Sequence, residues 1–165
     1  MSFTTALSTG ARHPLRRRLT ARTTVLAARL LARLAPHRLE RALAFLARGA
    51  APATEAQATA ARELVLTASP AMQGHRSCLP RSVAVALTCR LGGSWPTWCV
   101  GTLMSPPFSP HAWVEAEGRL IGEKGRYESW ARLVTVAAPG PSGQPGPSGQ
   151  PGQGLTGSRA ASSSR

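Results

Sequence analysis

The chain has 165 residues and carries 20 Lys and Arg against 7 acidic residues, which gives a net charge of +13. This length is typical of one domain, or of one small domain with extensions. The positive charge favours an anionic partner, such as an acidic peptide or protein. Nucleic acid is not the expected partner, since most of the arginines are scattered and no nucleic-acid-binding motif is present.

The cysteines and the hydrophobic pattern indicate the cellular compartment in which the protein is expected. There are three cysteines, Cys78, Cys89 and Cys99, and no signal peptide, so a disulfide framework is not expected. No Cys-x-x-Cys pair is present, and we expect neither a metal site nor any other cofactor. No apolar run approaches the ~20 residues of a transmembrane helix. We therefore predict a cytoplasmic protein with free thiols.

Composition divides the chain into four segments. The first is basic and expected to be disordered, the second is helical, the third is a compact core, and the fourth is a disordered tail rich in Gly, Pro, Ser and Gln. Their predicted bounds are 1–22, 23–68, 69–138 and 139–165. In the tail a glycine recurs at every third position from Gly140 to Gly152, as in collagen, but the run is too short to form a stable triple helix by itself.

The helical segment shows leucines at near-helical spacing from 24 to 48, with one interruption at Pro36. This pattern predicts two helices, 23–35 and 37–48, and a third follows at 55–66. We expect the first two to form an amphipathic hairpin that covers the core. The alternative is a helix that lies on a membrane surface or binds a partner.

The core segment has an α+β pattern. A helix is predicted from Cys78 to Leu91, because two glycines follow it at once. Strand-like runs come next, and Glu117-Gly118 between two of them is a hairpin turn signal. The expected strands are Thr97–Leu103, His111–Ala116, Arg119–Glu123 and Leu133–Ala137.

Cys78 is the candidate nucleophile. A thiol at a helix start lies near unpaired backbone N–H groups and the positive end of the helix dipole, so its pKa should fall. Arg81 follows one turn later and could pair with the thiolate, with a substrate carboxylate, or with a glutamate elsewhere. Cys89 and Cys99 are expected in the core.

His111 is the candidate base, and the acid that orients it depends on strand register. The chain has no Asp or Asn, so the third group must be a Glu, a Gln or a backbone carbonyl. Glu123 fits if residues 116–118 form a three-residue loop, which places it opposite His111 and pairs Glu115 with Arg119. A two-residue loop would put Glu123 on the opposite face, so the triad hypothesis requires one register.

The region from Cys78 to Glu123 resembles the leader peptidases of lasso-peptide biosynthesis, a branch of the transglutaminase-like, papain-related superfamily. The likeness extends over residues 25–135. The motifs that carry it are Cys78-Leu79-Pro80-Arg81-Ser82, Gly93-Ser94-Trp95-Pro96-Thr97-Trp98-Cys99-Val100-Gly101, Pro106-Pro107-Phe108, His111-Ala112-Trp113-Val114-Glu115 and Gly122-Glu123.

The resemblance implies a fold and a reaction. The catalytic Cys would start a helix packed on a small antiparallel sheet, and it would cut the leader from a ribosomally made precursor peptide. His111 would shuttle the proton and an acid would orient it, often Asp in that family where this chain has Glu123. Papain analogy suggests Gln73 as a second oxyanion donor beside the backbone N–H of Cys78.

The same resemblance implies partners. Besides the precursor peptide, a separate ATP-using cyclase would close the ring. The helical N-terminal region leaves no room for a winged-helix recognition domain, so a separate leader-recognition protein is expected. Two other readings stay open: a non-hydrolytic peptide-binding or acyl-transfer module of this fold, and a basic structural or nucleic-acid-binding protein.

Overall fold

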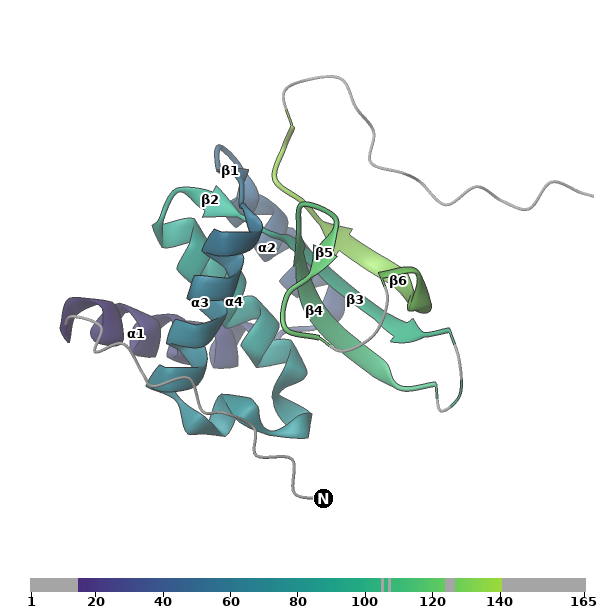
Figure 1. Cartoon of the computed structure of the whole chain (residues 1–165), viewed down its shortest axis with the longest axis horizontal. Coiled ribbons are helices and arrows are strands. Elements are labelled where there is room, and N and C mark those ends of the chain that lie inside the picture. The colour runs from purple at the N-terminus through teal and green to yellow at the C-terminus, as the bar shows by residue number, and fades with distance from the viewer. Residues whose placement is uncertain (1–14, 105, 107, 124–126, 141–165) are drawn as a thin grey trace, which may run out of the picture.

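The computed structural model describes residues 15–140 except 105, 107 and 124–126 (Figure 1). In this part of the chain it confirms the predicted α+β class. The α-helices are α1 (Leu15–Leu31), α2 (Pro36–Ala47), α3 (Glu55–Ala68) and α4 (Cys78–Leu91). The strands are β1 (Ala51–Pro52), β2 (Ser94–Trp95), β3 (Thr97–Leu103), β4 (Pro110–Ala116), β5 (Arg119–Leu120) and β6 (Trp130–Val136). Short 3-10 helices are η1 (Pro70–Gln73), η2 (His75–Ser77) and η3 (Tyr127–Ser129).

The helices pack beside a four-stranded antiparallel sheet with strand order β5-β4-β3-β6 (Figure 1). Helix α4 contacts β4 and β3, and both α1 and α3 pack on α4. Helix α2 packs against β6 instead. The two N-terminal helices thus cover different parts of the core. Helix α4 packs on the sheet, and its first residue lies next to β4.

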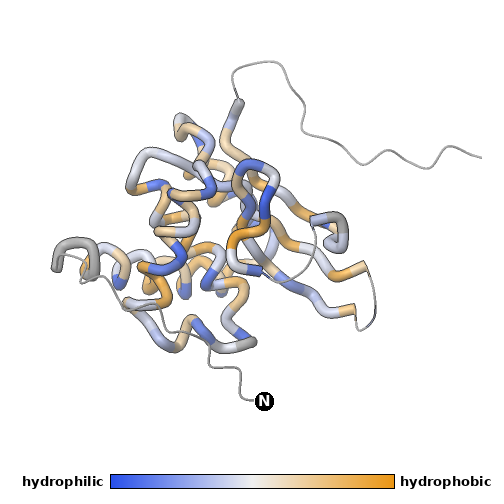
Figure 2. Tube along the Cα trace, viewed as in Figure 1, coloured by the Kyte–Doolittle hydropathy of each residue, from blue (hydrophilic) through white to orange (hydrophobic). Residues whose placement is uncertain are grey.

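The main core lies between α4 and the sheet, and hydrophobic residues occur on both helices and strands (Figure 2). Its buried members from these elements include Val83, Ala84, Val85, Ala86, Trp98, Val114 and Val136. Two buried indoles make hydrogen bonds here: Trp98 Nε1 donates to Ser82 Oγ at 3.0 Å, and Trp95 Nε1 donates to the Val136 carbonyl at 3.1 Å. Pairing these donors offsets the cost of burying them.

The opposite face of the sheet has a second cluster, formed by Cys99, Trp113 and Trp130. Glu115 is buried beside it with a side chain only 5% exposed. Its carboxylate accepts hydrogen bonds from Trp113 Nε1 at 2.7 Å, Tyr127 Oη at 3.0 Å and Arg132 Nε at 2.8 Å. The buried charge is therefore fully partnered, as burial requires.

The turn between β4 and β5 contradicts the predicted register. Glu115 is opposite Leu120 and Ala116 is opposite Arg119, so the loop has two residues, not three. Its residues, Glu117 and Gly118, both have positive φ, 50° and 73°, which is the type I′ conformation that closes two-residue hairpins. The predicted pairing of Glu115 with Arg119 is also wrong.

Arg119 pairs instead with Glu55 at the start of α3, at an N–O distance of 3.4 Å. Both side chains are substantially exposed, so this pair contributes little to stability. In the two-residue register Glu115 is opposite Leu120, and its side chain pairs with Arg132 of β6 instead.

Several predicted boundaries agree with the structure and others do not. Cys78–Leu91 and Thr97–Leu103 are confirmed to the residue, whereas β5 ends at Leu120 rather than at Glu123. Helix α1 begins at Leu15, so the expected disorder of residues 1–22 is wrong for 15–22. The basic run there reads as a charged tail, but Arg and Leu are strong helix formers. Residues 1–14 and most of the Gly-rich tail lie outside the described residues.

Among residues 15–140, apart from the gaps already named, no helix is long and apolar enough to cross a membrane.

Candidate active site

Cys78 is the first residue of α4 and is partly buried. The turn before it is held by Ser77, whose Oγ donates to the Ala71 carbonyl at 2.8 Å and makes no capping bond to the helix. The sulfur accepts hydrogen bonds from the backbone N–H groups of Leu79 and of Ala112, the latter on β4. One unpaired donor of the helix start and one donor of the sheet are thus directed at this sulfur.

The environment of Cys78 favours the thiolate. The side-chain hydrogen bond to His111 lowers the pKa of the thiol most, and the backbone N–H groups lower it further, which together outweigh the opposing effect of burial. Burial instead raises the pKa of Cys89 and of Cys99 to about 12. The expectation that these two lie in the core is confirmed, since they are 4% and 0% exposed. Cys78 is the one described thiol whose surroundings activate it.

His111 lies at the start of β4, opposite Gly101 of β3. Its Nε2 is 3.0 Å from Glu123 Oε2, close enough for an ion pair, although the N–H is not well aligned for a hydrogen bond. Because Nε2 is on the carboxylate side, we infer that Nδ1 is the nitrogen that meets the thiol. Interaction with Cys78, then with Glu123, raises the pKa of His111 to about 9 against the opposing effect of burial. The two shifts act together and favour a thiolate–imidazolium pair over a neutral thiol and imidazole.

Two tryptophans hold the imidazole in place. Trp113 stacks with it at a centroid distance of 6.1 Å and an interplanar angle of 13°. Trp130 lies at 5.2 Å with its plane tilted by 37°. The aromatic cluster on the outer face of the sheet thus restricts the orientation of the His111 ring.

Glu123 reaches His111 by a route that strand alternation does not predict. Regular pairing ends at Leu120, and the last backbone bond runs from Ile121 N–H to the Val114 carbonyl at 3.1 Å. Gly122 then turns the chain with a φ of 70°, which side chains disfavour. A Cβ at Gly122 would also collide with the guanidinium of Arg62. The turn redirects Glu123 toward His111, so the hypothesis of their pairing survives although its register is wrong.

Two arginines surround Glu123. Arg81 Nη2 is 3.4 Å from Glu123 Oε1, and Arg81 Nη1 donates to the Met72 carbonyl at 3.3 Å. Arg62 Nη2 donates to the Gly122 carbonyl at 3.0 Å. Burial alone would raise the pKa of Glu123, but His111, Arg81 and Arg62 outweigh it and lower that pKa. The acid is thus held in its charged form.

These contacts settle where the other predicted site residues lie. Arg81 pairs with a glutamate, the third of the alternatives left open for it. Gln73 ends η1 and is exposed, on the turn that leads toward Cys78. Arg62 was not predicted, because an arginine in the middle of a helix looks like an ordinary solvent-facing residue. Only the close approach of Gly122, a residue 60 positions away, reveals its contact.

The sequence matches the family described as the Transglutaminase-like superfamily over residues 9–135, well over half of the chain. The chain belongs to the transglutaminase-like superfamily. This superfamily includes cysteine peptidases, and the matched span contains Cys78, His111 and Glu123. Neither the curated proteins nor the solved structures contain a significant match. The transglutaminase-like assignment agrees with a helix-start cysteine beside an antiparallel sheet.

Proposed function

We propose that this transglutaminase-like protein is a cysteine peptidase that removes the leader from a lasso-peptide precursor before macrocyclisation. The observation that carries the proposal is the contact chain from the Cys78 thiol through His111 to Glu123, with the thiol pKa lowered and the imidazole pKa raised. The motif resemblance around these residues supports the choice of substrate.

The proposed reaction begins when the Cys78 thiolate attacks the scissile carbonyl carbon and forms a tetrahedral oxyanion. His111 then gives its proton to the leaving amine, the C–N bond breaks, and a thioester remains on Cys78. His111 next takes a proton from water, which attacks the thioester and releases the leader as a carboxylate. Glu123 orients the imidazole and stabilises its charged form throughout. The backbone N–H of Cys78 and the side chain of Gln73 are the proposed oxyanion donors.

The proposal includes a separate leader-recognition protein and a cyclase that acts afterwards. We expect purified full-length chain to cleave a precursor peptide efficiently only when the recognition protein is added, because the described residues include no recognition domain. Mass spectrometry of the peptide products measures this directly. Unchanged cleavage by the chain alone would contradict the need for a partner, and no cleavage with the partner present would contradict the peptidase. The reaction is expected in the cytoplasm, where free thiols stay reduced.

Acyl transfer is a second candidate, which membership of the transglutaminase-like superfamily favours. It would share the first half of the reaction, and an amine rather than water would then attack the thioester. The same mass spectra separate the two, because hydrolysis leaves a free carboxylate and transfer leaves an amide. If the leader product were found only as an amide, the reaction would be acyl transfer and not hydrolysis.

Glu123 offers a graded test of the site. Glu123→Gln removes the charge that holds the imidazolium, so we expect cleavage to fall by roughly ten- to a thousandfold. Glu123→Asp should be tolerated better, since the carboxylate is retained. The measurement is kcat/KM for precursor cleavage, with Glu40→Gln, an exposed acid on α2, as the matched control. Normal kinetics in Glu123→Gln would remove this residue from the proposed site.

A further inference from the structure

Helix α1 has a second face that packs on nothing in the described structure. One side of the helix is buried against α3 and α4. The buried residues on that side are Ala21, Thr24, Val25 and Ala28. On another side Leu19, Leu26 and Leu30 are 65%, 60% and 64% exposed. Three large aliphatic side chains in water on one helix need an explanation.

These leucines follow the spacing of a coiled-coil seam. Leu19, Thr23, Leu26 and Leu30 are separated by four, three and four residues, the alternation of d and a positions in a heptad repeat. At 3.6 residues per turn, they fall within about 60° of one another and extend over about 16 Å of the helix. The seam is narrow, and such a stripe fits between the side chains of a second helix.

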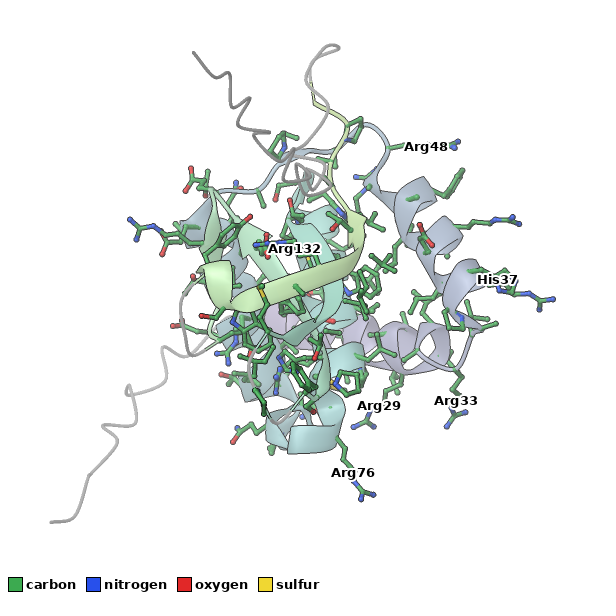
Figure 3. All side chains as sticks on the ribbon, turned by 90° about the vertical axis from the view of Figure 1, so that its right-hand side faces the viewer. Arg29, Arg33, His37, Arg48, Arg76 and Arg132 are labelled. Carbon is green, nitrogen blue, oxygen red and sulfur yellow. The ribbon has the colours of Figure 1, made fainter. Side chains whose placement is uncertain are left out.

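The seam has a strongly positive border. Arg22 and Arg29 are exposed and occupy the g positions beside it, and Arg33 follows in the turn after the helix. Helix α1 contains no acidic residue. Figure 3 shows Arg29 and Arg33 projecting away from the body of the molecule. Charges at g positions select the partner helix by opposite charge.

We propose that this face of α1 binds an amphipathic helix of another protein, one with leucine-like residues along its seam and glutamate or aspartate beside it. The inference does not depend on the chemistry proposed for Cys78, which lies at the start of a different helix. Apolar contact would contribute most of the binding energy, and the arginines would set the choice of partner.

Charge argues against two other occupants. A second copy packed antiparallel would bring Arg22 and Arg29 against their own counterparts, which is unfavourable, and a parallel copy would face them with Ala27 and Leu34, which carry no negative charge. The chain's own terminal segments also lack the acidic residues that would pair with these arginines. The chain has no Asp, and all seven glutamates lie between positions 40 and 128. An anionic membrane would attract the arginines, but helices that lie on bilayers have a broad apolar face, often with aromatic residues. Helix α1 has no aromatic residue.

The test uses two designed helical peptides of about three heptads, both with leucine at a and d. One has glutamate at e and g, and the other has lysine. Isothermal titration with the full chain should show binding of the glutamate peptide at least tenfold tighter than of the lysine peptide. Leu26→Ser combined with Leu30→Ser should weaken this binding at least tenfold. Because both leucines are exposed, circular dichroism and alkylation of Cys78 should not change.

Charge reversal gives the sharper result. Arg22→Glu combined with Arg29→Glu should reverse the preference, so that the lysine peptide binds better. The control, Arg38→Glu combined with Arg41→Glu, changes the net charge equally on exposed positions of α2 and should leave the preference unaltered. Equal binding of both peptides, no binding of either, or a preference reversed by the control would overturn the proposal. So would leucine-dependent dimers, or binding to phosphatidylserine vesicles without binding to the glutamate peptide.

Discussion

Replacing Cys78 by alanine is expected to abolish precursor cleavage while leaving the protein folded. The thiol is the only group that can form the thioester, and loss of a covalent nucleophile costs on the order of 10⁶ in kcat. The side chain is only partly buried at a helix end, so its removal should not disturb the core. Cleavage is followed by mass spectrometry, and the thermal unfolding transition is recorded for both proteins.

Cys89→Ala is the matched control for this variant. Cys89 is buried and burial raises the pKa of its thiol to about 12, so it takes no part in the chemistry. The substitution should reduce stability by about 1 kcal/mol through lost packing and should keep the activity. Equal loss of cleavage in the two variants would contradict the assignment of Cys78.

Glu115→Ala is expected to reduce the free energy of unfolding clearly, because this buried carboxylate joins three elements of the outer cluster. The carboxylate accepts hydrogen bonds from Trp113, Tyr127 and Arg132, and it is nearly inaccessible to water. Removing it leaves the buried Trp113 Nε1 without an acceptor, which typically costs about 1–3 kcal/mol, and it breaks the ion pair with Arg132, whose side chain is 26% exposed and can turn to water. Chemical denaturation of the variant and the parent measures the difference in the free energy of unfolding.

The control is Glu55→Gln, which breaks the exposed pair with Arg119. Exposed pairs contribute about 0–1 kcal/mol, so this variant should unfold almost like the parent. If Glu115→Ala were no more destabilised than Glu55→Gln, the buried carboxylate would not be holding the outer cluster together.

Local sequence signals predict parts of this fold well. The α4 helix ends at a Gly-Gly pair, and β3 is a short run with β-forming residues, so both sets of bounds are recoverable from the sequence. The start of α1 is not, because a basic run without hydrophobic periodicity is typical of disordered tails as well as of a first helical turn. Its helical state depends partly on packing against α3 and α4, which no local pattern records.

Local sequence signals predict only part of the candidate site. Cys78 and His111 carry recognisable signals in the sequence, a helix start and a strand start. Strand alternation points to Glu123 only through a three-residue loop that the structure does not have, and Glu123 reaches His111 because Gly122 bends the chain out of the strand. Alternation along a strand applies only while the strand continues. Arg62 and the partners of Glu115 depend on contacts between distant segments, so no local pattern reveals them.

The most direct measurement of the central claim is the pH dependence of alkylation of each cysteine by iodoacetamide, mapped by mass spectrometry. Cys78 should react near neutral pH with an apparent pKa below the ordinary ~8.5 of a free thiol, while Cys89 and Cys99 stay unmodified in the folded protein. His111→Ala should move the Cys78 pKa upward, because the hydrogen bond that lowers it most is lost. Since the imidazolium persists up to about pH 9, the shift should be evident throughout the neutral range. Reaction of Cys78 only above ~8.5, or an unchanged profile in His111→Ala, would contradict a thiolate–imidazolium pair at this site.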